Sequence, residues 1–190
     1  TIVSNTAGLA TLLGFGTLPG QTAIDVGTLI DNGQVIKVIA SYPVSPSPSK
    51  INSFEAYFRK GKMELELVPQ GTLVERIRAG GAGIPAFFTP TGAGTQLSEG
   101  KEAREFDGRQ HILEHALKSD FALVKGYKAD TLGNLTYRGT SQNFGAVMVR
   151  STGISIVEVD QVVNIGEIDP HLVHTPALFV DRIVPCDLRL

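Results

Sequence analysis

The hydrophobic positions of the chain fall into short apolar runs rich in Val, Ile and Phe, separated by polar and charged stretches. These runs predict strands over 34–40, 63–68, 86–89, 121–125, 154–159 and 177–183. Several are continuously apolar rather than alternating, which is typical of parallel strands covered on both faces. The pattern predicts an α/β fold with a mostly parallel open sheet, helices on both faces and a single domain over residues 1–190.

Two turn signals interrupt this pattern. Asp107-Gly108 stands between two mixed runs and predicts a small antiparallel hairpin. The stretch "SYPVSPSPSKINS", residues 41–53, carries three prolines and predicts a loop. The opening "TIVSN" reads as the middle of a β-branched strand, so we expect further residues upstream of Thr1.

The stretch "VPQGTLVERIRAGGAG", residues 68–83, indicates a strand followed at once by a helix. Thr72 and Glu75 have the spacing of a capping box, which predicts a helix from Thr72 that Gly80-Gly81 end. Gln70 and Gly71 would then lie on a strand-to-helix turn, where open parallel sheets bind ligands. A glutamine there can donate an N–H to a carbonyl or anionic oxygen. The alternative is that Gln70 only caps the turn and the glycines are helix stops.

Composition and charge narrow the function classes. A net charge of −2 gives no basic field for nucleic acid, and no apolar run reaches the roughly 18 residues of a membrane span. The single cysteine, Cys186, excludes an intrachain disulfide and fits a reducing, intracellular setting. "HILEH", residues 111–115, matches a zinc pattern only on a helix, and the preceding turn favours an extended segment, so no metal is expected. Arg76 and Arg78 are interpreted as solvated surface charges.

Six segments together resemble the α subunit of the class I 3-oxoacid CoA-transferases. They are "VSNTAG", "VPQGTLVERIRAGGAGIPAFFTPTGAGT", "EGKEAREFDGRQHILEHAL", "DFALVKGYKADTLGNLTYR", "QNFGAVM" and "TPALFVDRIV". The resemblance implies transfer of coenzyme A between succinyl-CoA and a 3-oxo acid, either acetoacetate or 3-oxoadipate. It further implies a ping-pong route through a glutamyl-CoA thioester, without a cofactor beyond the coenzyme A substrate. A bacterial cytoplasmic location fits this family.

The same resemblance implies roles for particular residues. Gln70 corresponds to the glutamine of the family's acyl pocket, and Asn5 is a second pocket residue. Thr6 stands where the family has another asparagine. Gly80, Gly81 and Gly83 are expected to shape the loop beside the acyl group.

The nucleophilic glutamate of the family lies in a Glu-Asn-Gly motif of the β subunit, and these 190 residues contain no such motif. We therefore expect a β-subunit partner, in an α2β2 heterotetramer, and no activity without it. Acyl-CoA and carboxylic acids would be the substrates.

Two departures from the family pattern stand out. The family's Gly-Gly-Phe turn and the strand before it have no counterpart here, and the stretch from Leu9 to about Val26 is longer than expected. Two other interpretations stay open. One is a ligand-sensing, non-catalytic domain on the same scaffold, and the other is an isomerase or hydrolase with its own catalytic carboxylate.

Overall fold

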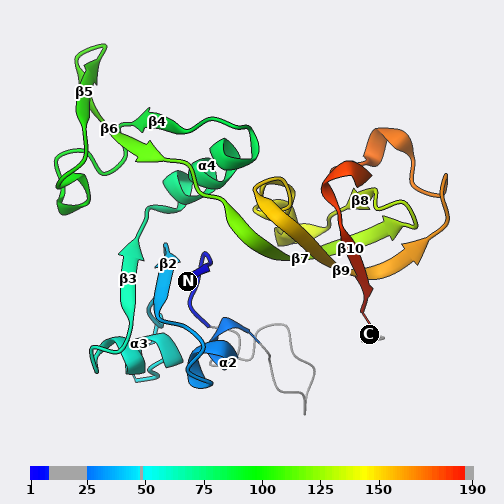
Figure 1. The fold of residues 1–190 in the computed structure, drawn as a ribbon, viewed down its shortest axis with the longest axis horizontal. Helices are drawn as coiled ribbons and strands as arrows, with labels where there is room; N and C mark the ends of the chain where they lie inside the picture. The colour runs from blue at the N-terminus through cyan, green and yellow to red at the C-terminus, as the bar shows by residue number, and fades with distance from the viewer. Residues whose placement is uncertain (9–24, 48, 187–190) are drawn as a thin grey trace. The chain divides into compact units, whose positions relative to one another are not determined.

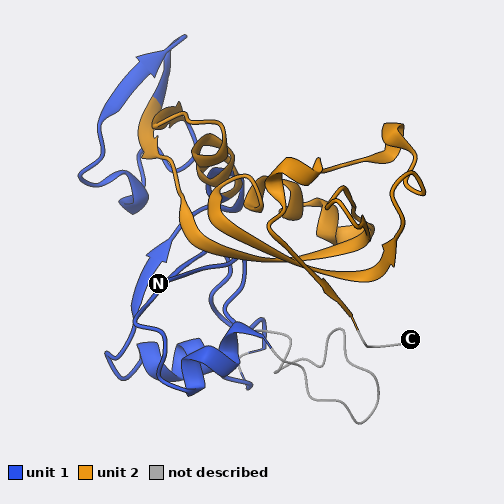
Figure 2. Cartoon of the chain, turned by 45° about the vertical axis from the view of Figure 1, so that its right-hand side comes forward, with its two compact units in different colours: residues 1–73, 90–110 blue, residues 74–89, 111–190 orange. Residues whose placement is uncertain are grey.

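The computed structural model describes residues 1–8, 25–47 and 49–186. The chain forms two compact units, one of residues 1–73 and 90–110 and the other of residues 74–89 and 111–190 (Figure 2). Each unit has its own sheet, and the α/β fold class with parallel sheets is confirmed. The prediction of a single domain stays a prediction. The stretch from Leu9 to Ile24 lies outside the described residues.

Unit 1 is built on a parallel three-stranded sheet in the order β1-β2-β3 (Figure 1). The strands are β1 (Ile2–Val3), β2 (Lys37–Ala40) and β3 (Glu64–Leu67). Val38 in the central strand pairs with Ile2 on one side and Leu65 on the other. The predicted strand over 63–68 is confirmed to within one residue at each end, whereas that over 34–40 begins three residues late. Because all three strands run the same way, their carboxyl ends lie at one edge of the sheet.

Two short helices complete the described core of unit 1, and the sequence pattern did not predict either. Asp25 caps α2 (Val26–Asp31) by accepting from the Gly27 N–H at 2.8 Å. Asn52 caps α3 (Ser53–Phe58) in a reciprocal capping box with Glu55, which contributes about 1 kcal/mol. Ile30 from α2 and Phe54 from α3 are fully buried with the apolar residues of the sheet.

The proline-rich stretch before α3 is a loop, as predicted. The Asn52 amide donates to the Pro43 carbonyl at 2.9 Å, and the Ser45 N–H donates to the Glu55 carboxylate at 3.0 Å. The capping residues of α3 thus also hold this loop.

Unit 2 is built on a four-stranded sheet in the order β10-β9-β7-β8 (Figure 1). The long strands β7 (Ser119–Asp130) and β9 (Thr152–Val163) run parallel, with β10 (Arg182–Pro185) parallel to β9 and β8 (Leu135–Thr136) antiparallel to β7. Val124, Leu135 and Val157 belong to the buried cluster of this sheet, which α5 (Gly145–Met148) adjoins. Three 3-10 turns connect these elements: η2 (Gly139–Gln142), η3 (Pro170–Leu172) and η4 (Ala177–Phe179).

The predicted strand over 177–183 is wrong in its first half. Ala177–Phe179 forms the 3-10 turn η4, and the strand begins only at Arg182. Pro176 starts this turn, and the Ala177 N–H donates to the side chain of Asn134 at 3.0 Å instead of to a neighbouring strand. The Asp181 carboxylate then accepts from the Ser155 N–H at 2.8 Å and fixes the start of β10 beside β9.

A small antiparallel sheet has the order β4-β6-β5. It contains β4 (Ala86–Thr89), β5 (Ala103–Phe106) and β6 (Arg109–His115), and the 3-10 turn η1 (Gln96–Ser98) precedes β5. Asp107 and Gly108, with φ of 50° and 73°, form the turn between β5 and β6, which confirms the predicted hairpin. The segment His111–His115 is therefore strand rather than helix, and no metal-binding cluster of His, Cys, Asp and Glu occurs among the described residues.

Helix α4 (Gln70–Gly81) follows β3 and differs at both ends from the prediction. It begins at Gln70, because the Leu73 N–H already donates to the Pro69 carbonyl at 2.8 Å. The capping box on Thr72 is therefore wrong, and the Thr72 hydroxyl has no hydrogen-bond partner. At the other end, Gly81 is still helical. No helix among the described residues is long and apolar enough to cross a membrane.

Candidate functional site

The two amide side chains predicted from different parts of the sequence meet at the carboxyl edge of the unit 1 sheet. Asn5 follows β1, and Gln70 is the first residue of α4 after β3. The Gln70 Nε2 donates to the Asn5 Oδ1 at 3.1 Å. Because 65 residues separate the two in sequence, the parallel sheet is what brings them together.

The backbone around Asn5 is fixed by the neighbouring strand. The Ser4 N–H donates to the Ile39 carbonyl at 3.0 Å, and the Asn5 carbonyl accepts from the Tyr42 N–H at 2.9 Å. Thr6 and Tyr42 continue this ladder as a parallel bridge beyond the end of β2. The Asn5 side chain is therefore presented from a hydrogen-bonded segment.

The Asn5–Gln70 pair retains hydrogen-bonding capacity. A glutamine amide has two N–H donors and one carbonyl acceptor, and the bond to Asn5 uses one donor. Gln70 is exposed, whereas Asn5 is half-buried. The second N–H of Gln70 is thus available to an oxygen atom of a ligand at this edge.

Two buried hydroxyl groups near this edge have no partner in the described part of the chain. They belong to Ser41, which directly follows β2, and to Thr72, in the first turn of α4. The exposed fraction of Thr72 is only 3%. A buried hydroxyl without a partner is rare and calls for a bound group or water. The sequence pattern missed both residues, since serine and threonine carry no distinctive signal there.

The predicted glycines lie at the other end of α4, and local structure accounts for each of them. A Cβ on Gly80 would overlap the Leu117 carbonyl oxygen, and one on Gly81 would lie 2.9 Å from the Arg150 carbonyl oxygen. Gly83 has φ of 73°, and the Ile84 N–H donates across it to the Ala79 carbonyl at 2.9 Å, which is a Schellman helix end. Their contact with substrate stays a prediction.

The interpretation of Arg76 as a solvated charge is wrong. Its side chain is 12% exposed, and its Nε donates to the His115 carbonyl at 2.8 Å and lies 3.9 Å from the Glu114 carboxylate. Arg78, by contrast, is half-exposed and pairs with Glu75 at 2.7 Å. The buried arginine of unit 2 is thus already engaged within its own unit.

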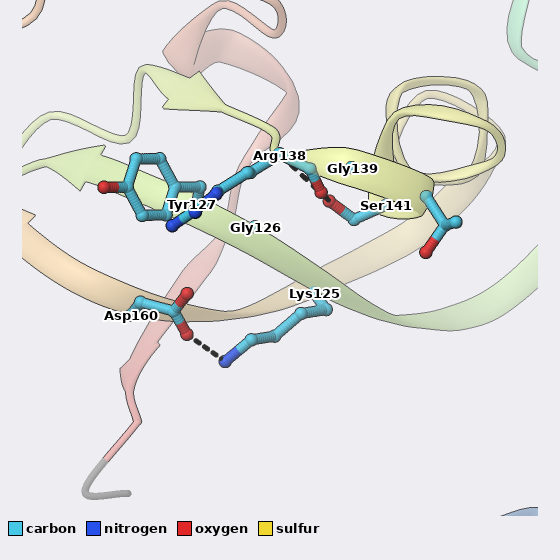
Figure 3. A pocket seen from close by; sticks show the side chains of 8 residues that line it. Lys125, Gly126, Tyr127, Arg138, Gly139, Ser141 and Asp160 are labelled. Atoms are coloured by element: carbon cyan, nitrogen blue, oxygen red, sulfur yellow. Dashed lines mark hydrogen bonds and ion pairs between the residues drawn. The ribbon is translucent and has the colours of Figure 1, made fainter. Parts of the chain in front are cut away.

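Unit 2 contains a hollow of about 390 Å³ whose lining includes Lys125, Tyr127, Arg138 and Asp160 (Figure 3). The Lys125 Nζ lies 2.6 Å from the Asp160 carboxylate and 2.8 Å from that of Glu158. Desolvation lowers the pKa of Lys125, but hydrogen bonds to Asp160 and Glu158 and their charges outweigh it and hold the pKa above its usual range. Lys125 is thus a charged structural group, and none of the predicted site residues lines this hollow.

Comparison with known proteins places the chain in a family. The model of the family described as Coenzyme A transferase matches residues 1–185. The chain belongs to the coenzyme A transferase family. It is 48% identical over 184 residues to the α subunit of 3-oxoadipate CoA-transferase from Pseudomonas putida, a match that covers 97% of this chain and 73% of that protein. It is also 49% identical over 159 residues to the probable α subunit of succinyl-CoA:3-ketoacid coenzyme A transferase from Bacillus subtilis, covering 84% of this chain and 65% of that protein.

Solved structures of coenzyme A transferases share the fold. Glutaconate coenzyme A-transferase from Acidaminococcus fermentans superposes with a TM-score of 0.73 at 19% identity, covering 84% of this chain and 57% of that chain. An acyl-CoA transferase from E. coli O157:H7 gives a TM-score of 0.74 at 19% identity, covering 88% and 37%. At these identities the likeness concerns the fold alone.

Proposed function

We propose that this chain is the α subunit of a 3-oxoacid CoA-transferase, which moves coenzyme A between succinyl-CoA and acetoacetate or 3-oxoadipate. The observation that carries the proposal is the hydrogen bond between Gln70 and Asn5 at the carboxyl edge of the unit 1 sheet. These are the two residues that the family resemblance assigns to the acyl pocket. The names of the Pseudomonas putida and Bacillus subtilis relatives support the reaction.

In this proposal, the chain binds and polarises the acyl group, while the partner carries out the covalent step. A carboxylate nucleophile divides one difficult acyl transfer into two easier ones, and each passes through a tetrahedral intermediate with an oxyanion. The family's Glu-Asn-Gly motif is absent from these 190 residues, so the glutamate belongs to a β subunit. The free N–H of Gln70 would donate to the carbonyl oxygen as its negative charge develops. An α2β2 assembly in the bacterial cytoplasm is the arrangement we propose.

The acid substrate depends on whether a second carboxylate can be bound. A buried arginine is the natural partner of such a group, because its guanidinium forms paired hydrogen bonds with a carboxylate. Arg76 is largely buried, but its Nε is already bonded to the His115 carbonyl. This chain therefore does not offer Arg76 for 3-oxoadipate, and a cation for that acid would come from the partner.

The test is a spectrophotometric assay of coenzyme A transfer from succinyl-CoA to acetoacetate and, separately, to 3-oxoadipate. The chain is assayed alone and with its co-expressed partner, and the partner is assayed alone as a control. We expect activity only when both chains are present, and the preferred acceptor names the substrate. Activity of this chain alone would contradict the proposal, because the nucleophile would then lie within these 190 residues.

A further inference from the structure

Gly71 is a glycine that the fold itself does not require. It is the second residue of α4, where glycine is the weakest helix former except proline. Its φ is not in the left-handed region, and an added Cβ would meet nothing within 4 Å. Alanine would therefore fit the described structure at this position and favour the helix.

The other glycines whose surroundings the structure describes all have a local explanation. One group has φ between 59° and 111°, a conformation that other residues rarely adopt. The remainder have a neighbouring atom 3.2 Å or less from an added Cβ. Gly71 belongs to neither group, so the reason for its missing side chain lies outside the described chain.

Gly71 also lies between two polar side chains of the candidate site. Gln70 precedes it, with a free N–H beside Asn5, and Thr72 follows it, with a buried hydroxyl that has no partner. The backbone N–H groups of Gly71 and Thr72 are in the first helical turn, and neither has an acceptor among the described residues. Open space, free donors and an unsatisfied hydroxyl thus coincide at one turn.

We propose that Gly71 is a specificity-determining residue, whose missing side chain leaves room for the acyl group of the thioester to pass over its Cα toward Gln70. This inference rests on the proposed function and extends it to the shape of the acyl pocket. The ligand class is a short acyl chain joined to coenzyme A, which both halves of the transfer reaction place in the same space. A single methyl group on Gly71 would occupy that space.

The experiment compares the wild-type complex with the Gly71→Ala complex in the transfer assay, with the thermal midpoint of unfolding and partner binding by size-exclusion chromatography measured in parallel. We expect kcat/KM to fall about tenfold or more, the range in which one methyl group acts in a pocket. The midpoint should stay unchanged or rise, and the complex should remain assembled. Arg78→Ala is the matched control, since it alters an exposed side chain of the same helix and should retain wild-type kcat/KM.

Each other result overturns the inference in a recognisable way. Wild-type kcat/KM in Gly71→Ala would overturn it and leave the proposed function intact. Loss of the partner in Gly71→Ala would show that Gly71 faces the other subunit rather than the acyl group. An inactive wild-type complex would overturn the proposed function, and this inference with it.

Discussion

The side chain of Asn5 sets the orientation of the Gln70 amide. An isolated glutamine at a helix start can rotate freely, but the bond from its Nε2 to the Asn5 Oδ1 selects one orientation. The second N–H on the same nitrogen then points to a defined position. A donor that is held in place before the reaction costs no reorganisation when the oxyanion forms, which is why such donors are effective.

Coupling between these two residues is testable with a double-mutant cycle on the assembled enzyme. Gln70→Ala should lower kcat about 10²-fold, the usual cost of losing one oxyanion donor. Asn5→Ala should cost less, and the double variant should be little worse than Gln70→Ala, since Asn5 acts partly through Gln70. The measurement is kcat and KM for all four proteins.

Lys62→Ala, an exposed change in the turn before β3, is the control for this cycle and should retain wild-type kcat. Fully additive losses would show that Asn5 and Gln70 act independently. A wild-type kcat in Gln70→Ala would remove Gln70 from the catalytic account.

At the scale of elements, the turn between β7 and β8 depends on one carboxylate. Asp130 accepts from the N–H groups of Leu132, Gly133 and Asn134 at 2.9–3.1 Å, and from the Asn134 side chain at 2.8 Å. Burial raises the pKa of Asp130, but these hydrogen bonds outweigh it and hold the pKa below its usual range. Because Asn134 also accepts from the Ala177 N–H, the carboxylate links this turn to η4.

Asp130 should therefore contribute pH-dependent stability. The folded pKa lies below the unfolded value of about 3.9, so the contribution is complete above about pH 4 and is lost as the pH falls further. Asp130→Ala should lower the free energy of unfolding by about 2–3 kcal/mol at pH 7, with a smaller difference from wild type below pH 4. Urea unfolding between pH 3 and 7 measures this.

Asp120→Ala serves as the control, because Asp120 is an exposed aspartate of the same strand. A difference between Asp130→Ala and wild type that stays constant across the whole pH range would mean that the charge of Asp130 contributes nothing.

The elements that the sequence pattern predicted well are those with an uninterrupted apolar run. β4 has the predicted bounds, while β7 and β9 extend beyond theirs because their ends carry polar and charged residues such as Asp120 and Lys128. Helix α3 was missed since its six residues have no apolar stripe, although Asn52 and Glu55 are a recognisable start signal. The apolar residues of η4 resembled a strand until Pro176 was seen to begin a turn.

The candidate site was only partly predictable for a different reason. Gln70 was placed by the strand-to-helix turn and Asn5 by the family resemblance, but the bond between them depends on the register of three parallel strands. The pattern also favoured Gly80, Gly81 and Gly83, because glycine needed by a helix end and glycine needed by a ligand look alike in sequence. Only the surroundings of each Cα separate them.

At the scale of the whole molecule, the proposed division of labour concerns which chain carries the covalent intermediate. The chain spans 73% of the Pseudomonas putida relative and 65% of the Bacillus subtilis relative, each named as one subunit of a CoA-transferase. Such names imply a second, different subunit. The account assigns acyl binding to Asn5 and Gln70 here, and the nucleophile to the partner.

Mass spectrometry of the assembled enzyme after incubation with succinyl-CoA tests this assignment most directly. Each chain is digested and searched for a glutamyl residue carrying coenzyme A, with borohydride reduction to trap the thioester. The account predicts the modification on the partner chain and none on the ten glutamates of this one. Coenzyme A bound to a glutamate within these 190 residues would contradict it.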